Sequence, residues 1–163
     1  MKLEQAQSIA ETIKEQLAPH CDRIEIAGSI RRKRPQVNDI EIVAIPKPYE
    51  TGLFESGIAT VVNRWQKVKG ELPCKYTQRI LPDGIKLDLF FATHKNWGLI
   101  YAIRTGSAEF SHKVLATGWV KKGARSENGI LISSNGHPVP VAEEEDLFEF
   151  IGIEFIEPEK REV

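Results

Sequence analysis

Hydrophobic residues recur every three or four positions in the first 17 residues of the chain. This period predicts an amphipathic helix that ends near Pro19. Further along, the period shortens to two, which is typical of strands with one buried face. A turn signal, Pro82-Asp83-Gly84, separates the last two strands of this half and predicts a hairpin. The elements predicted after the first helix are strands at 23–27 and 39–45, a helix at 54–68, and strands at 72–81 and 85–91.

The pattern changes after residue 95, where helical stretches are followed by glycine-containing turns. A last helix begins in an acidic run, Ala142–Asp146, whose negative charge suits the positive end of a helix dipole. We therefore divide the chain into 1–95 and 96–163 and predict an α+β fold, a mixed β-sheet with flanking helices followed by a small α/β subdomain. The elements predicted in the second part are helices at 96–103 and 107–117, hairpin turns at Gly123, Asn128-Gly129 and Asn135-Gly136, and the helix through Phe150.

Composition narrows the class of protein. The 163 residues are 41% hydrophobic and 28% charged, and no apolar run is long enough to cross a bilayer. Cys21 and Cys74 lack partners at ligand spacing, so we expect neither a disulfide framework nor a zinc site, and we expect a reducing cytosol. The acidic, amphipathic start is unlike a secretory signal. The net charge of −1 argues against a strong non-specific nucleic-acid binder.

Two carboxylates, Asp39 and Glu41, stand two positions apart in a predicted strand and therefore project from one face. Such a pair repels itself unless a cation neutralises it, and oxygen ligands suit a hard divalent ion. The alternative is the solvated outer face of an edge strand, which is the more common meaning of an isolated acidic pair.

Two neighbouring features favour the metal site over a solvated edge. Gly28-Ser29-Ile30-Arg31-Arg32 follows a predicted strand, and its backbone N–H groups, hydroxyl and guanidinium groups suit phosphate binding. Asp88 lies among apolar residues in the 85–91 strand, where it either pairs with Lys86 or, if that strand neighbours 39–45, completes a three-carboxylate cluster. Such a cluster accommodates two metal ions roughly 3.5–4 Å apart, the arrangement used for phosphoryl transfer.

These residues resemble a known family. Gly28-Ser29 followed by Asp39-Ile40-Glu41 is similar to the signature of the nucleotidyltransferase superfamily. Other motifs narrow the resemblance to family X DNA polymerases, the DNA polymerase beta group, and in particular to truncated, viral-type members made of a palm and a thumb alone. Those motifs are Gly-Ser-Ile-Arg-Arg at 28–32, Lys-Leu-Asp-Leu-Phe at 86–90, Arg-Thr-Gly-Ser-Ala-Glu-Phe at 104–110, the hairpin at 126–130 and the segments between Glu144 and Glu159.

The resemblance implies a palm at 1–95, a thumb at 96–163 and catalysis by two metal ions, Mg²⁺ or Mn²⁺. Asp39 and Glu41 would bind both ions, and Asp88 would bind the catalytic ion and activate the primer 3′ hydroxyl. The implied substrate-binding residues are Gly28, Ser29 and Arg32 for the triphosphate, Lys86 to orient Asp88, and Thr105, Gly106 and Ser107 as a loop beneath the nucleotide sugar, often with unusual peptide geometry at Gly-Ser.

Several positions depart from the family pattern. Glu41 stands where the family usually has Asp, which leaves the choice between Mg²⁺ and Mn²⁺ open. Ile103-Arg104 replaces an aromatic pair that discriminates against a 2′ hydroxyl, so we expect weak sugar discrimination. Ser111 and Leu115 replace an Asn and an Arg that touch the base and template, so we expect low fidelity.

The sequence therefore predicts a minimal, gap-filling or repair type of DNA-directed nucleotidyltransferase. We expect its partners to be gapped or primer–template DNA and nucleoside triphosphates, with no membrane, and we expect a monomer in the cytoplasm, or in the host cytoplasm if the source is viral. One alternative is an untemplated or RNA-directed nucleotidyltransferase. Another, from a different class, is a catalytically weak nucleic-acid-binding palm, although three mutually repelling carboxylates argue for a working site.

Overall fold

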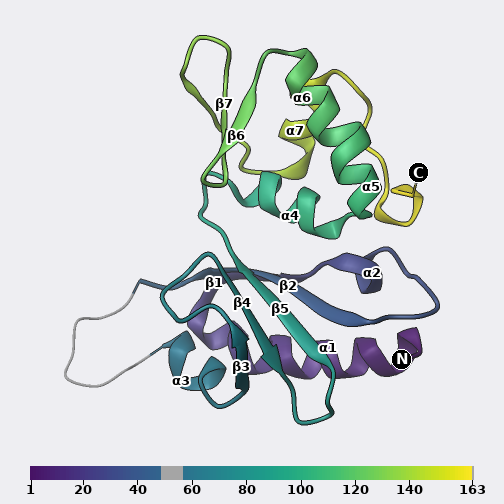
Figure 1. The fold of residues 1–163 in the computed structure, drawn as a ribbon, viewed down its shortest axis with the longest axis vertical. Helices are drawn as coiled ribbons and strands as arrows, with labels where there is room; N and C mark the ends of the chain where they lie inside the picture. Colours follow the sequence, from purple (N-terminus) through teal and green to yellow (C-terminus); the bar gives the residue numbers. More distant parts are fainter. Residues whose placement is uncertain (49–56, 163) are drawn as a thin grey trace. The chain divides into compact units, whose positions relative to one another are not determined.

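The chain folds into two compact units, Met1–Phe91 (unit 1) and Ala92–Val163 (unit 2). The computed structural model in Figure 1 describes residues 1–48 and 57–162. Along the chain, the boundary between the units falls between Phe91 and Ala92. The sequence pattern predicts it after residue 95. Within the described residues, no helix combines the length and the apolar character needed to span a membrane.

Unit 1 is built on a five-stranded mixed sheet with the strand order β1-β2-β5-β4-β3. The central strands β2 and β5 run parallel, and every other neighbouring pair is antiparallel. The prediction of an α+β fold with a mixed sheet is therefore confirmed. The elements of unit 1 are α1 (Leu3–Leu17), a 3-10 turn η1 (Ala18–His20), β1 (Cys21–Ile26), α2 (Gly28–Arg31), β2 (Asp39–Pro46), α3 (Ile58–Val62), β3 (Gln66–Lys69), β4 (Tyr76–Ile80) and β5 (Lys86–Phe91).

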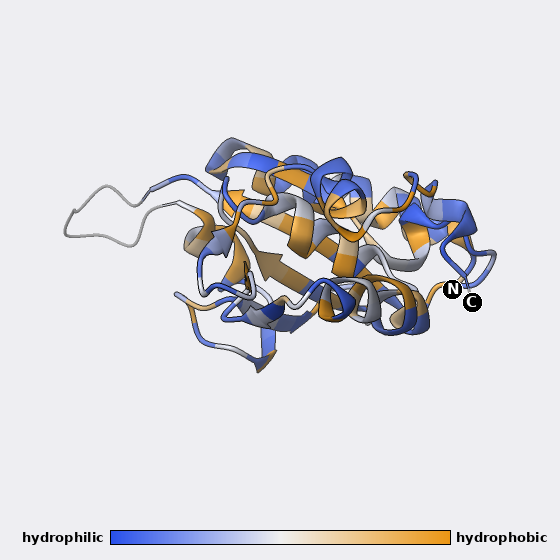
Figure 2. Cartoon of the chain, turned by 90° about the horizontal axis from the view of Figure 1, so that it is seen from above, coloured by the Kyte–Doolittle hydropathy of each residue, from blue (hydrophilic) through white to orange (hydrophobic). Residues whose placement is uncertain are grey.

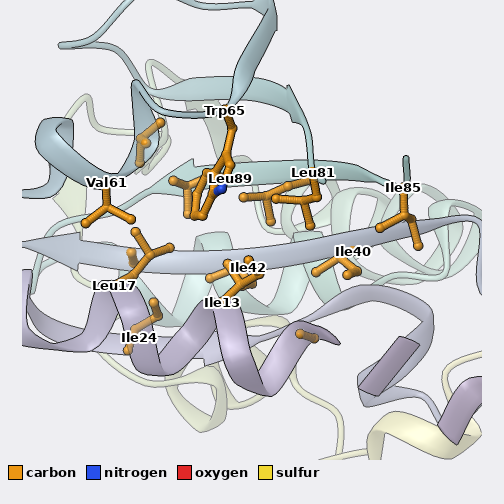
Figure 3. Close-up of a cluster of buried hydrophobic side chains, with 14 of the residues drawn as sticks. Ile13, Leu17, Ile24, Ile40, Ile42, Val61, Trp65, Leu81, Ile85 and Leu89 are labelled. Atoms are coloured by element: carbon orange, nitrogen blue, oxygen red, sulfur yellow. The ribbon is translucent and has the colours of Figure 1, made fainter. Parts of the chain in front are cut away.

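One face of this sheet carries the hydrophobic core of unit 1. Ile40 and Ile42 of β2 are fully buried there, together with Leu87 and Leu89 of β5. The apolar stripe of α1 packs on the same cluster, as its three- and four-residue period predicts. Figure 3 shows Ile40, Ile42 and Leu89 in one cluster with residues of α1, with Val61 of α3 and with Trp65. Because side chains alternate along a strand, the polar residues between these positions belong to the opposite face of the sheet.

Two predicted elements of unit 1 are corrected by the structure. The helix predicted at 54–68 is confined to Ile58–Val62 among the described residues, while 54–56 lie outside them, and Gln66–Lys69 is the edge strand β3. Its residues are all exposed, so local hydrophobic periodicity carried no strand signal there. The strand predicted at 72–81 begins only at Tyr76. Pro73 lacks the N–H that a strand ladder requires, which accounts for the late start.

The turn before β4 is held by a buried arginine. Arg79 is 3% exposed, and its guanidinium donates to the carbonyl oxygens of Trp65 and Gly70 and to the hydroxyl of Thr77. A buried charge without such partners would be costly, so these bonds fix the path of the chain between β3 and β4.

Unit 2 encloses a separate core that is rich in aromatic residues. Phe110, Trp119 and Phe148 pack there with aliphatic side chains from the three-stranded sheet β6-β7-β8 and from α4 and α7. Figure 2 colours the chain by hydropathy and shows hydrophobic and hydrophilic residues interspersed along its helices and strands. The elements are α4 (Trp97–Thr105), α5 (Ala108–Phe110), a π-helical segment η2 (Ser111–Ala116), α6 (Thr117–Lys121), β6 (Arg125–Glu127), β7 (Ile130–Ile132), β8 (Pro138–Val139), α7 (Glu144–Ile151) and a 3-10 turn η3 (Pro158–Lys160).

The helices predicted in unit 2 and the hairpin turns at Asn128-Gly129 and Asn135-Gly136 are confirmed. The hairpin turn predicted at Gly123 is wrong, because this glycine joins helix α6 to strand β6. The helical path predicted to end at 117 continues through α6 to Lys121. Asn128-Gly129 forms the turn of the β6–β7 hairpin, with both residues at positive φ, as such turns require. The final helix begins in the acidic run, where Glu143 and Asp146 form a reciprocal capping box that satisfies two free N–H groups.

A buried ion pair joins the C-terminal segment of unit 2 to α7. Arg161 is completely buried, and its Nη1 lies 2.6 Å from Oε2 of Glu144, which is 5% exposed. The Arg161 Nε donates to the carbonyl oxygen of Ile156, and the guanidinium lies 5.1 Å from the ring centroids of both Phe148 and Phe155. Arg161, which directly follows η3, thus anchors the C-terminal segment to the core of unit 2.

Candidate active site

The Gly28 loop lies directly against the carboxylate strand β2. The N–H of Ala27 donates to the carbonyl oxygen of Glu41 at 2.8 Å. Gly28 has φ +61°, and a Cβ placed on it would lie 1.7 Å from Oε2 of Glu41. The positive φ favours glycine at this position, and a larger residue would displace the Glu41 carboxylate. The two halves of the candidate nucleotide–metal site are adjacent, as the sequence predicts.

The three candidate carboxylates share one face of the sheet. In the parallel pairing of β2 with β5, Glu41 lies beside Asp88, and Asp39 lies beside Lys86. The sequence placed Asp88 in the cluster only if its strand neighbours the strand at 39–45. The pairing of β2 with β5 meets this condition. The row continues into β4, where Gln78 lies opposite Asp88. A polar row therefore crosses the three central strands on the face away from the α1 core.

Asp88 is held by two hydrogen bonds from β4. Its side chain is buried, with 8% of the residue exposed. Oδ1 accepts from the hydroxyl of Tyr76 at 2.5 Å and from Nε2 of Gln78 at 2.8 Å. The ring of Tyr76 stacks on Phe90, with centroids 4.8 Å apart. The sequence did not identify Tyr76 and Gln78 as site residues. Two polar residues at alternate positions of a strand are common, and their role becomes visible only when β4 is known to pair with β5.

The electrostatics of the site show that the carboxylates interact. Burial raises the pKa of Asp39 above its usual value, the nearby Asp88 carboxylate raises it further, and Lys86 opposes the rise. Lys86 thus acts on Asp39, its neighbour across the β2–β5 pairing. The role implied for Lys86, orienting Asp88, stays a prediction, and the hydrogen bonds to Asp88 described above come from Tyr76 and Gln78.

The chemistry of the three carboxylates suits a divalent cation. All three groups are carboxylates, the ligands that Mg²⁺ and Mn²⁺ prefer, and the like charges of Asp39 and Asp88 would be relieved by a cation. Within residues 1–48 and 57–162, however, no three acidic, histidine or cysteine side chains converge closely enough to hold an ion unaided. Mg²⁺ at phosphoryl-transfer sites is usually held by one or two carboxylates with water and substrate phosphates, so Asp39 and Asp88 fit this use.

The other predicted phosphate ligands lie in the tight turn that follows Gly28. Ser29 and Arg32 are both partly exposed. The carbonyl oxygen of Ser29 accepts from the N–H of Arg34 at 2.9 Å, and the N–H of Arg32 donates to the carbonyl oxygen of Gly28 at 3.1 Å. The backbone of this turn is therefore fixed by its own hydrogen bonds next to the carboxylate strand.

The loop predicted to lie beneath the nucleotide sugar follows α4 in unit 2. Thr105 is fully buried, and its hydroxyl donates to the carbonyl oxygen of Tyr101 at 2.7 Å. Gly106 has φ +70°, and the peptide bond between Gly106 and Ser107 is cis, in agreement with the unusual geometry expected there. The N–H of Ser107 donates to the carbonyl oxygen of Arg161 at 2.9 Å, so the C-terminal segment holds this loop in place.

Three of the unit 2 positions that depart from the family pattern, Ile103, Ser111 and Leu115, are engaged within that unit. Leu115 is fully buried in the core. The hydroxyl of Ser111 donates to the carbonyl oxygen of Ile103 at 2.8 Å, and the Ile103 side chain packs against the core cluster. Arg104, by contrast, is exposed.

One comparison with known proteins gives a match. Residues 100–162 match the family model of the DNA polymerase beta thumb. The matched segment lies wholly within unit 2 and supports a relationship with DNA polymerase beta-like, family X enzymes. No curated protein was found to match the sequence.

Proposed function

We propose that this protein is a minimal DNA polymerase beta-like nucleotidyltransferase, which adds nucleotides to a primer 3′ hydroxyl in gap filling or repair. The observation that carries the proposal is the arrangement of Asp39, Glu41 and Asp88 on one sheet face beside the Gly28 loop. The thumb match in unit 2 supports DNA as the partner.

In this proposal each part of unit 1 has a separate task. Ser29 and Arg32 bind the triphosphate of the incoming nucleotide, because a hydroxyl and a guanidinium fork both suit phosphate oxygens. Asp39, Glu41 and Asp88 hold the divalent ions, Mg²⁺ or Mn²⁺. When bound, such ions lower the pKa of the attacking hydroxyl and neutralise charge on the phosphates. The burial of Asp88 keeps its carboxylate fixed and shielded from bulk water.

In unit 2, the Thr105–Ser107 loop is proposed to support the nucleotide sugar. The Thr105 hydroxyl is buried and bonded to the carbonyl oxygen of Tyr101, so it is not available to the sugar. The aromatic pair that rejects a 2′ hydroxyl in the family is replaced by Ile103-Arg104. Weak selection between deoxy- and ribonucleotides follows from this replacement.

A second candidate function is untemplated addition to a nucleic-acid end. It is favoured by the positions of Ser111 and Leu115. Related polymerases carry an Asn and an Arg at these two positions, which contact the base and the template. The Leu115 side chain is fully buried, and the Ser111 hydroxyl is bonded to the backbone of α4. Neither side chain is placed to read a template, so low fidelity is expected in the templated reaction as well.

An extension assay separates these functions. The protein is incubated with a labelled single-nucleotide-gapped duplex, a blunt duplex or a single strand, with each dNTP or NTP and with Mg²⁺ or Mn²⁺. Templated filling of the gap supports the first function, and extension of the single strand supports the second. Binding without extension would overturn both and leave a nucleic-acid-binding palm.

The carboxylate roles are tested by Asp39→Asn and Asp88→Asn. Each is expected to lower kcat by at least about 10²-fold, since ion-mediated charge stabilisation contributes several kcal/mol. Asp83→Asn, in the exposed β4–β5 turn, is the matched control and should retain full activity. Urea denaturation shows whether the variants remain folded. Wild-type rates in a folded Asp39→Asn or Asp88→Asn variant would refute the assigned roles.

Sugar selection is measured as the ratio of kcat/KM for dATP and ATP on one primer. We expect a ratio below about 10³, which corresponds to less than ~4 kcal/mol of discrimination. Replacing Ile103-Arg104 by the aromatic pair Tyr-Phe should raise the ratio. A wild-type ratio above that limit would contradict the interpretation of these two positions.

A further inference from the structure

We propose that Tyr76 and Gln78 are positioning residues, which orient the Asp88 carboxylate so that its second oxygen faces a bound divalent ion. This inference rests on the proposed function. It concerns two residues of β4 that the sequence motifs of the site do not include.

The two hydrogen bonds are directed at one atom. The Tyr76 hydroxyl and the Gln78 amide both donate to Oδ1 of Asp88, at 2.5 and 2.8 Å. A carboxylate has two oxygens, each able to accept more than one bond. Two donors on Oδ1 fix the plane of the carboxyl group and turn Oδ2 away from β4. Ligating carboxylates in proteins are commonly oriented in this way by outer partners.

Both donors are themselves held by the sheet. Gln78 lies directly opposite Asp88 in the antiparallel pairing of β4 with β5. Tyr76 lies opposite Phe90, and the two rings are nearly parallel, with an interplanar angle of 17°. The hydroxyl and the amide are therefore placed by backbone pairing and ring stacking, and rotation of the Asp88 side chain would break both hydrogen bonds.

The chemical nature of the donors favours an orienting role over simple neutralisation. A lysine or arginine at this position would cancel the charge of Asp88. A hydroxyl and an amide are neutral, so they satisfy the buried carboxylate and leave its negative charge available to a cation.

The test measures the binding of Mn²⁺ to the full chain, without nucleotide or DNA. Binding is monitored by electron paramagnetic resonance. Tyr76→Phe removes the hydroxyl and keeps the ring that stacks on Phe90, and Gln78→Leu removes the amide. Each substitution is expected to weaken Mn²⁺ binding about tenfold, and both together by up to about 100-fold. Tyr101→Phe and Gln66→Leu, outside this network, are the matched controls and should bind Mn²⁺ like the unchanged protein.

A second readout separates positioning from a purely structural role. In primer extension, the same two variants should show a lower kcat and a higher Mg²⁺ requirement, with the KM for the nucleotide unchanged, because Ser29 and Arg32 are untouched. If Gln78→Leu unfolds, Gln78→Met replaces it. Thermal denaturation curves show which variants remain folded at the assay temperature.

The outcomes distinguish this inference from the proposed function. If Asp88→Asn abolishes Mn²⁺ binding while folded Tyr76→Phe and Gln78→Leu bind Mn²⁺ normally, the positioning role is overturned and the proposed function stands. If the unchanged protein binds no Mn²⁺ through Asp39 and Asp88, the metal site of the proposed function fails and this inference fails with it.

Discussion

The two units of the chain bury charge in opposite ways. In unit 2, Arg161 and Glu144 are an opposite pair at 2.6 Å, sealed inside the core. In unit 1, partial burial raises the pKa of Asp39, and the like charge of Asp88 raises it further. The pair in unit 2 joins two segments of chain. The raised pKa of Asp39 means that its charged form is disfavoured in the fold, a cost that the proposed metal site would offset by binding a cation.

The two units also differ in the kind of sequence signal that they carry. The family match lies in unit 2, whose identity is spread over many packed positions of an aromatic core. The candidate chemistry lies in unit 1, where it rests on a few polar residues that share one sheet face. Substitutions in unit 2 should therefore change stability most, and substitutions in the unit 1 site should change activity most.

The largest expected effect is loss of the buried ion pair. Arg161→Met leaves Glu144 buried without its cation and should lower the free energy of unfolding by about 3–5 kcal/mol. The double variant Arg161→Met with Glu144→Leu removes both charges and should recover much of the loss. Urea denaturation of the full chain measures both. Equal losses in the single and double variants would show that the packing of Arg161, and not its charge pairing, stabilises unit 2.

A smaller effect is expected from Gly98→Ala in α4. A Cβ at this position would lie 2.1 Å from the backbone carbonyl carbon of Glu143, which cannot move without shifting the start of α7. We expect a loss of about 1–3 kcal/mol, measured by thermal unfolding. Gly118→Ala is the control, because its new Cβ would meet only the Ile151 side chain, at 3.0 Å or more. A loss in the control as large as that in Gly98→Ala would contradict the explanation.

The matching substitution in unit 1 is Gly28→Ala. Its Cβ would meet the end of the Glu41 side chain, which can turn away, so the main cost to stability is the positive φ, about 1–2 kcal/mol. Activity should fall far more, because the displaced carboxylate belongs to the candidate site. Combining Gly28→Ala with Glu41→Ala relieves the contact and should not restore primer extension. Full activity in Gly28→Ala would separate Glu41 from the chemistry.

The smallest expected effect has the opposite sign. Because the folded-state pKa of Asp39 is raised, its charged form is disfavoured in the fold, and stability falls as pH rises through that pKa. Asp39→Asn should therefore stabilise the protein at pH 7, by on the order of 0.5 kcal/mol for a partly exposed carboxylate. The gain should vanish near pH 3, below the unfolded-state pKa of about 3.9. Thermal denaturation at both pH values checks this, and a less stable variant at pH 7 would refute it.

Local patterns in the sequence determined most elements of the fold and the polarity of their faces. The period of α1, the alternation in β2 and the glycine turns follow from side-chain spacing and backbone freedom, which act over a few residues. Gly28, Asp39 and Glu41 could be recognised as candidates for the same reason. Periodicity states which face of a strand is polar, and it does not state which strand lies beside it.

Only the tertiary structure decided the neighbours. The parallel pairing of β2 with β5 places Asp88 beside Glu41, and the pairing of β4 with β5 brings Tyr76 and Gln78 onto Asp88. The exposed strand β3 likewise exists through its partner β4. These contacts join residues far apart in the chain, so no local pattern encodes them, and they form only when the apolar faces of the sheet are buried together.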